Sequence, residues 1–185
     1  TGLRKQMCQT FGFIVPQFRI EDSFEVDPDS YRITLGGAAI GGGKIKPNHL
    51  LAIDTGEAMN SQPIPGEATV DPSFGCPALW IDPGTSDLAV AEGYLAVDPE
   101  SVIATHIHQL LATRAHDLLG PDQVRDLIDH LRGRHGQLIE TITPQPLTLA
   151  AVTRVLKALL ADGISLRHSL RVFSSLSLAA QQTAA

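Results

Sequence analysis

Residues 66–83, with the sequence GEATVDPSFGCPALWIDP, constrain the fold of this chain more than any other stretch. They include the only tryptophan of the chain, Trp80, and one of its six phenylalanines, Phe74. Their prolines and glycines exclude a helix, because proline has no amide hydrogen and clashes with the preceding turn. A stiff loop that presents aromatic side chains suits a contact surface. The alternative is that both aromatic residues anchor a core beneath a structural loop.

The composition excludes several classes of protein. Hydrophobic residues make up 43% of the 185 residues, which is enough for a substantial core. The formal net charge is -6 and no basic block is present, which argues against a nucleic-acid-binding module. No run of about 18 apolar residues is long enough to span a membrane. Two distant cysteines, Cys8 and Cys76, make no disulfide framework and indicate a reducing compartment.

The first 35 residues read as a helix followed by two strands. Apolar residues at helical spacing predict a helix over residues 3–13, which Gly12 ends. Alternation of apolar and polar residues predicts strands over residues 14–21 and 31–35. A helix and neighbouring strands indicate a mixed α/β layer.

The glycine-rich residues 36–44 are similar to a phosphate-binding loop but do not match it. Ala38 stands where that motif needs a glycine, and Ile45 stands where it needs the serine or threonine that reaches magnesium. We therefore expect a glycine-containing turn or bulge between two strands.

The block from residue 50 to residue 98 has short strands and many turns, and is expected to form a small subdomain of its own. Its predicted elements are strands at residues 50–54, 78–81 and 93–97 and a helical turn at residues 87–92.

From residue 98 onward the pattern is helical. Asp98-Pro99-Glu100 is a helix start, with a capping acid, a proline in the first turn and an acid near the positive end of the helix dipole. An apolar face continues to Leu119, where Gly120-Pro121 is expected to end the helix. Further helices are predicted at residues 122–131, 137–142 and 148–161 and from Ser165, and residues 179–185 are expected to fray.

Three groups of residues are candidates for chemistry. His106 and His108 lie two apart on a predicted helix and so point to different sides, which argues against a shared metal ion. Cys76 is a candidate nucleophile for an enzyme, but no histidine stands at a known spacing from it, and a small buried thiol is favoured. Asp71 either caps its own turn or contacts a partner, and its spacing favours the turn.

Five segments of the chain, taken in order, resemble the cytoplasmic region of the type III secretion export-gate family, the flagellar FlhA and injectisome SctV proteins. The segments are LRKQMCQTFGFIVPQFRIEDS, YRITLGGAAIGGGKIKPNHLLAIDTG, GEATVDPSFGCPALWI, GYLAVDPESVIATHIHQLLATRAHDLLGPDQVRDLIDHL and PLTLAAVTRVLKALLADGISLRHSLRVFSSL. The wording of the first segment favours the flagellar branch, with the injectisome branch as the alternative.

The resemblance implies a fold and a place in the cell. Family members have a membrane part and a cytoplasmic part of four subdomains, which forms a nine-membered ring. This chain is similar to a soluble fragment of that region, on the cytoplasmic side of the bacterial inner membrane. The implied class is α+β: a small mixed α/β subdomain (residues 1–49 and 99–118), a small α/β subdomain inserted at residues 50–98, and an α-helical subdomain at residues 119–185.

The resemblance also implies a function in binding and no catalysis, cofactor or metal. In flagellar members an apolar dimple docks export chaperones with their bound substrates. The family motif places Asp71, Phe74 and Thr105 at that site, with Phe74 as the aromatic anchor and the other two as hydrogen-bonding groups. Cys76 replaces the usual leucine of the motif, which leaves the role of this position open. An enzyme that uses Cys76 or a histidine-containing site is the alternative from a different class.

Overall fold

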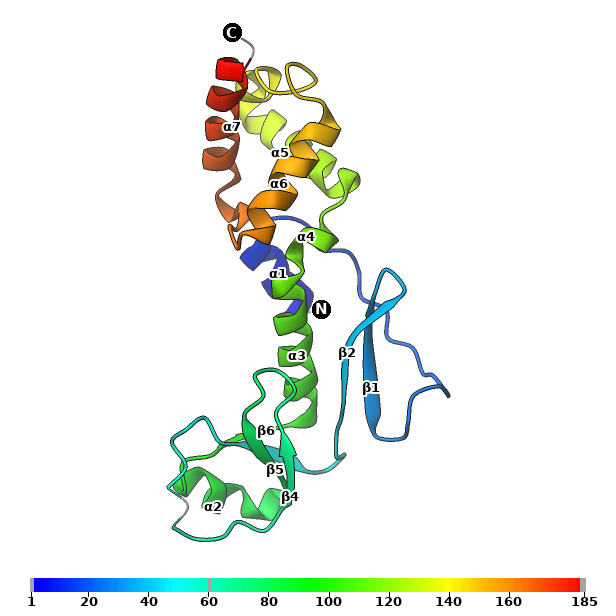
Figure 1. Ribbon diagram of the computed structural model, residues 1–185, viewed down its shortest axis with the longest axis vertical. Coiled ribbons are helices and arrows are strands. Elements are labelled where there is room, and N and C mark those ends of the chain that lie inside the picture. The colour runs from blue at the N-terminus through cyan, green and yellow to red at the C-terminus, as the bar shows by residue number, and fades with distance from the viewer. Residues whose placement is uncertain (1, 60, 184–185) are drawn as a thin grey trace. The chain divides into compact units, whose positions relative to one another are not determined.

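The structure is a computed structural model that describes residues 2–59 and 61–183 (Figure 1). It combines α-helices with two small antiparallel sheets, which confirms the predicted α+β class. The chain divides into two compact units. Unit 1 comprises Thr1–Ile20 and Leu111–Ala185, and unit 2 comprises Glu21–Leu110. The division into three subdomains remains a prediction.

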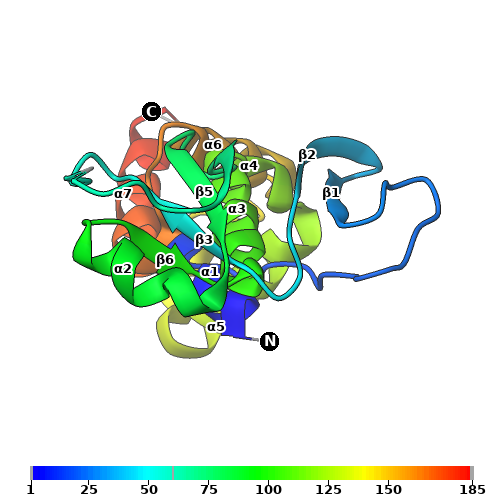
Figure 2. The ribbon, with the colours of Figure 1, turned by 90° about the horizontal axis from the view of Figure 1, so that it is seen from below.

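Unit 2 is built around an antiparallel sheet of four strands in the order β4-β5-β3-β6. Alternate residues of a strand face opposite sides of its sheet. In this sheet, apolar side chains pack on both faces. On one face, Leu51 and Trp80 pack with Val102 of helix α3. On the other, Ala52 and Ile81 pack with Ala89 of helix α2. The elements are β3 (Leu50–Ile53), β4 (Glu67–Val70), β5 (Pro77–Ile81), η1 (Pro83–Thr85), α2 (Ser86–Ala91), β6 (Leu95–Val97) and α3 (Pro99–Thr113). Figure 2 shows this unit from below.

The stretch at residues 66–83 folds as a β-hairpin. The predicted strand at residues 78–81 is confirmed as β5. It pairs with β4, whose residues were predicted to belong to a loop. Glu67 lies opposite Trp80, and Val70 lies opposite Pro77. The strand β4 is only four residues long and lies between Gly66 and Asp71-Pro72, so its sequence is typical of a loop. It forms a strand because it pairs with β5.

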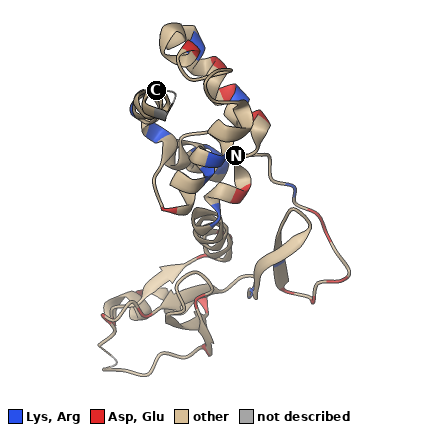
Figure 3. Cartoon of the chain, turned by 45° about the horizontal axis from the view of Figure 1, so that its top comes forward, with Lys and Arg blue, Asp and Glu red and all other residues tan. Residues whose placement is uncertain are grey.

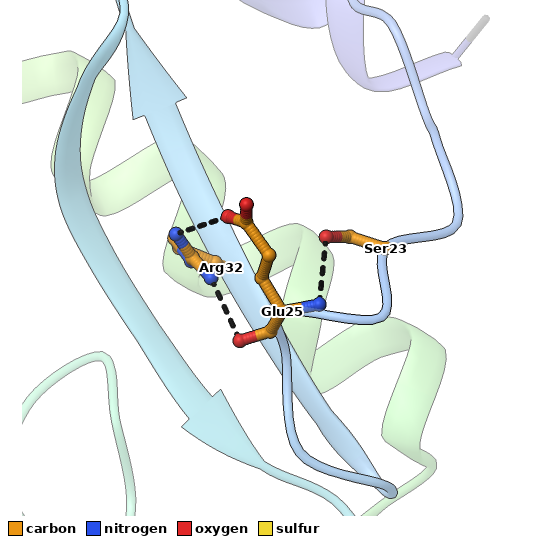
Figure 4. Close-up of polar contacts among 3 residues, drawn as sticks. All are labelled: Ser23, Glu25 and Arg32. Atoms are coloured by element: carbon orange, nitrogen blue, oxygen red, sulfur yellow. Dashed lines mark hydrogen bonds and ion pairs between the residues drawn. The ribbon is translucent and has the colours of Figure 1, made fainter.

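A second hairpin joins β1 (Ser30–Leu35) to β2 (Ala38–Lys44). Gly36 and Gly37 form its turn with φ angles of 57° and 82°, which glycine adopts without strain. The expected glycine-containing turn between two strands is therefore confirmed, and the pairing also shifts register between Ile33 and Thr34. The Arg32 side chain donates to the Glu25 carbonyl oxygen at 3.0 Å and pairs with its carboxylate at 3.8 Å, which attaches the preceding loop to β1 (Figure 4).

The predicted strand over residues 14–21 is wrong. In the described part of the chain these residues have no regular secondary structure and pair with no strand. Val15 instead contacts α1 (Gly2–Phe11): its amide donates to the Cys8 sulfur at 3.2 Å, and its carbonyl accepts from Arg4 at 2.8 Å. Alternation alone predicted a strand, but a strand also needs a partner for its backbone groups.

The predicted helix from Pro99 to Leu119 breaks at Arg114, which has φ -120° and ψ 22°. The segment therefore forms two helices, α3 and the short helix α4 (Ala115–Leu118). The amide of Asp117 donates to the Arg114 carbonyl oxygen at 2.9 Å, so the break is stabilised by a new turn. The Asp98 cap is confirmed, because its carboxylate accepts from the Ser101 amide and hydroxyl, both at 2.8 Å.

Unit 1 is helical, and several of its helices contact helices that are distant in the sequence. Its remaining helices are α5 (Pro121–Glu140), α6 (Leu149–Ala161), η2 (Leu166–His168) and α7 (Ser169–Thr183). Two predicted helices, at residues 122–131 and 137–142, are one helix α5 with a kink at His135. The tail was expected to fray from residue 179, but α7 continues to Thr183; residues 184–185 lie outside the described part.

Charged residues are distributed over both units (Figure 3). In the described part of the chain, no helix is both long enough and apolar enough to cross a membrane.

Candidate docking site on unit 2

The turn between β4 and β5 is held by Asp71. Its carboxylate oxygen Oδ2 accepts a hydrogen bond from the Phe74 amide at 2.8 Å. Its backbone amide donates to the Cys76 carbonyl oxygen at 2.8 Å, and its carbonyl accepts from the Gly75 amide at 2.9 Å. Asp71 is 3% exposed, so the residue that holds the turn is itself buried. The expectation that Asp71 caps its own turn is therefore confirmed.

The two aromatic residues of this hairpin have opposite environments. Trp80 is 5% exposed and packs in the sheet core with Leu51, Ala78 and Val102. Phe74 is 66% exposed at the turn. The reading of both as core anchors is correct for Trp80 and wrong for Phe74. Asp71 and Gly75, whose φ is 72°, fix the backbone on both sides of the exposed ring, which limits the entropy that a partner must remove on binding it.

Thr105 lies on α3, and its side chain is exposed. Its hydroxyl donates to the Ser101 carbonyl oxygen at 2.8 Å, one turn earlier in the same helix. No hydrogen bond joins Thr105 to Asp71 or Phe74 in the described part of the chain. The structure thus places Asp71 and Phe74 in direct contact and leaves Thr105 available as a hydrogen-bond acceptor on α3 of the same unit.

A second polar contact in unit 2 joins β1 to α3. Tyr31 of β1 and His106 of α3 are joined by a hydrogen bond of 2.7 Å between the phenolic oxygen and Nδ1. Burial, together with a smaller contribution from the Asp71 carboxylate, raises the pKa of Tyr31 to about 12. Burial lowers the pKa of His106, while Asp71 acts in the opposite direction.

The sequence analysis missed this pair. Tyr31 and His106 are 75 residues apart, and no spacing rule connects them. One local signal was present: His106 lies four residues after Val102 and four before Leu110, on the apolar face of the predicted helix. A histidine on such a face is expected to be buried, and His106 is 5% exposed.

The other candidates for chemistry show no assembled centre. Cys76 is a half-buried free thiol, and its sulfur makes no hydrogen bond to a histidine in the described part of the chain. Among the same residues no group of three His, Cys, Asp or Glu side chains could hold a metal ion. Two open grooves of about 600 and 370 Å³ both lie in unit 1, and none of Asp71, Phe74 and Thr105 lines them.

Comparison with known proteins identifies relatives along nearly the whole chain. Residues 1–185 match the FHIPEP family. The flagellar biosynthesis protein FlhA of Bacillus subtilis is 36% identical over 174 residues, which cover 94% of this chain and 25% of the relative. FlhA of Escherichia coli is 34% identical over 175 residues, which cover 95% of this chain and 25% of the relative. The chain thus spans about a quarter of the length of these curated relatives.

Solved structures share the fold. The CdsV protein of Chlamydia pneumoniae aligns with a TM-score of 0.82 and 22% identity, over 97% of this chain and 51% of the other. The nonameric SctV-C from EPEC aligns with a TM-score of 0.71 and 15% identity, over 98% of this chain and 54% of the other. At these identities the likeness concerns the fold alone. Together with the match over the full sequence, it confirms the resemblance drawn from the motifs: the chain belongs to the FHIPEP family.

Proposed function

We propose that this chain is part of a type III protein-export gate and that unit 2 is a docking platform for export chaperones carrying their substrates. The family membership supports the first part, because the curated relatives are named as flagellar biosynthesis proteins. The flagellar branch is preferred, since those relatives are 31–36% identical. The injectisome branch is the alternative. In the full-length protein we expect a ring on the cytoplasmic side of the inner membrane, since the related SctV-C is nonameric.

The observation that carries the docking proposal is the exposed ring of Phe74 on a capped turn. Phe74 exposes 66% of its surface, whereas Trp80 of the same hairpin is 5% exposed. A large aromatic side chain on a rigid backbone is the typical anchor of a protein interface, because it offers apolar area at a small entropic cost. Thr105 supplies an exposed oxygen on α3 of the same unit, and Asp71 orients the anchor.

A binding titration with matched variants tests this function. The probe is a flagellar export chaperone in complex with its substrate, encoded in the same genome as this chain. We expect Phe74→Ala to weaken binding at least about 30-fold, the effect of losing an interface anchor. Val90→Ala is the control, because Val90 is also exposed (57%) and lies on α2 of the same unit. We expect its binding to stay within about twofold of wild type.

The outcomes separate the alternatives. Unchanged binding of Phe74→Ala would refute the docking site. Binding of an injectisome chaperone in preference to the flagellar one would favour the other branch of the family. Circular dichroism and thermal unfolding accompany each titration, so that a loss of binding by an unfolded variant is recognised.

A further inference from the structure

The strand β4 is an open edge of the four-stranded sheet in unit 2. The strand order β4-β5-β3-β6 places it at one end, and within the described part of the chain no strand pairs with its outer side (Figure 1). Its residues are exposed except Thr69, which is half-buried. The outer edge of such a strand carries backbone N–H and C=O groups that are able to pair with an added strand.

The register of the hairpin identifies these free backbone groups. The Asp71 amide donates to the Cys76 carbonyl oxygen at 2.8 Å, so these two residues form a hydrogen-bonded pair at the end of the ladder. Hydrogen-bonded and non-hydrogen-bonded pairs alternate along an antiparallel ladder. The next pair is Val70 with Pro77, which has no amide hydrogen and so fits a non-hydrogen-bonded position. Val70 and, two residues earlier, Ala68 therefore direct their N–H and C=O groups away from β5.

Exposed apolar side chains lie on the same hairpin. Val70 is 59% exposed, and Phe74 in the turn that follows is 66% exposed. A side chain of an added strand that lies opposite Val70 would cover it. The backbone groups of a helix are already paired within the helix, so free groups together with an apolar side chain suit a segment in extended conformation.

The charge of unit 2 determines which extended segments it attracts. Residues 21–110 contain 14 acidic and three basic side chains, a formal net charge of -11, whereas the whole chain has -6 (Figure 3). On β4 itself, Glu67 has a side chain that is 64% exposed, and its carboxylate pairs with Lys46. An acidic surface attracts a basic segment and repels an acidic one. The outer edge of β4 therefore fits an extended segment that is basic and partly apolar.

We propose that the outer edge of β4 binds an extended, basic segment of the exported protein by β-strand addition. The segment pairs with the backbone of Ala68 and Val70 and covers the Val70 side chain. An exported protein fits better than its chaperone, because a folded chaperone pairs its own backbone groups, whereas the protein that it holds is kept from folding. This inference rests on the proposed docking function: Phe74 receives the chaperone, and β4 of the same hairpin receives the protein that the chaperone carries.

Hydrogen exchange tests the outer edge of β4 without any partner protein. In the isolated chain we expect fast exchange at the amides of Ala68 and Val70 and slow exchange at Thr69, whose amide faces β5. The probe is a synthetic peptide of about ten residues that alternates valine and lysine. At saturation it should slow exchange at Ala68 and Val70 at least about tenfold. Slow exchange at these amides in the free chain, or exchange that the peptide leaves unchanged, would overturn the proposal.

Two modified peptides distinguish strand addition from attraction by charge alone. With every second backbone amide N-methylated, one of the two possible patterns should abolish binding and the other should retain it, because only one edge of the peptide faces β4. Equal binding of both patterns would refute strand addition. Glutamate in place of lysine should abolish protection at Ala68 and Val70. Protection by the glutamate peptide as strong as by the lysine peptide would refute the selection of a basic segment.

A matched pair of proline variants tests the same edge from the side of the protein. Ala68→Pro removes an outward N–H, and proline is tolerated on an edge strand where its nitrogen faces solvent. We expect this variant to melt near the wild-type temperature and to bind the peptide at least about fivefold more weakly, the effect of one lost hydrogen bond. Thr69→Pro removes an inward N–H and should instead disrupt the hairpin. If Ala68→Pro folds and binds the peptide as wild type does, the proposal is wrong.

Titration with the flagellar chaperone, alone and with its substrate, then tests which protein occupies β4. Ala68→Pro should weaken binding of the loaded chaperone about fivefold and leave binding of the empty chaperone unchanged. Equal weakening of both would assign the outer edge of β4 to the chaperone and overturn the proposal. Failure of the docking function itself would appear separately, as unchanged binding of Phe74→Ala, and the exchange experiment with the peptide does not depend on it.

Discussion

The carboxylate of Asp71 lies 2.8 Å from the amide nitrogen of Phe74, so a buried acid fixes the backbone of an exposed aromatic residue. The two residues that the family motif assigns to one docking site therefore have different physical tasks. Phe74 offers surface to a partner, and Asp71 determines how that surface is held.

Substitutions at Asp71 can separate its acceptor oxygen from its charge. We expect Asp71→Ala to lower the free energy of unfolding by about 1 kcal/mol, because the Phe74 amide loses its acceptor. Asp71→Asn keeps an acceptor oxygen and should lose less. Urea unfolding followed by circular dichroism measures both values, with Asp87→Ala as a control for the loss of one exposed acid. Equal losses for Asn and Ala would show that the charge matters and the acceptor does not.

Trp80 and Phe74 should respond oppositely to truncation. Trp80→Ala removes a side chain that is 5% exposed and packed between β3 and α3, so we expect it to cost about 3–5 kcal/mol of folding stability. Phe74→Ala should change stability by less than about 0.5 kcal/mol. Chemical denaturation followed by circular dichroism suits both variants, since Trp80 is the only tryptophan and its fluorescence disappears in the first. A large loss of stability in Phe74→Ala would show that Phe74 anchors the core.

Gly12 is expected to tolerate no side chain. Its φ is 84°, and a Cβ there would overlap the backbone of Leu166 and Arg167. Gly163 is a matched control, because its φ is 77° and no heavy atom lies within 4 Å of the corresponding Cβ. Gly163→Ala should cost about 1–2 kcal/mol from backbone strain alone, and Gly12→Ala should cost clearly more. Melting temperatures of the two variants measured side by side check this, and similar values would contradict the packing of α1 on η2.

The Tyr31 phenol should ionise at a higher pH than an ordinary tyrosine. In a Tyr94→Phe background it is the only tyrosine of the chain, so its ultraviolet absorbance can be titrated alone. We expect a pKa of about 12 in the folded protein against 10.0 when unfolded. Because the folded value is the higher one, the contribution of Tyr31 to stability is complete below pH 10 and is lost as the pH rises from 10 toward 12. A folded-state midpoint near 10 would contradict the burial of this phenol.

The sequence alone predicted the elements that have strong local signals. The Asp98 cap, the Gly36-Gly37 turn and the strand with Trp80 were all read correctly, because capping residues, positive-φ glycines and alternation act over a few residues. The errors came where pairing decides the structure. Residues 14–21 alternate like a strand but have no partner, whereas β4 has loop-like residues and does have one.

The candidate site was predicted in part for the same reason. The cap between Asp71 and Phe74 spans three residues and could be inferred from spacing. The exposure of Phe74 could not, because whether an aromatic side chain is buried depends on what the rest of the chain places against it. The contact between Tyr31 and His106 depends on a hairpin and a helix that meet across 75 residues of sequence.

Unit 1 combines residues that precede unit 2 in the sequence with residues that follow it, and this has a consequence for the order of events during synthesis. All residues of unit 2 have been made once the ribosome passes residue 110. Helix α1, in contrast, gains its contacts with η2 only when Leu166 and Arg167 have been made, several seconds later at ordinary rates of translation. Helix α1 is therefore among the last helices of unit 1 to form its native contacts, although it is made before every other one. Its apolar residues Met7 and Phe11 stay accessible to the folding machinery of the cell until then.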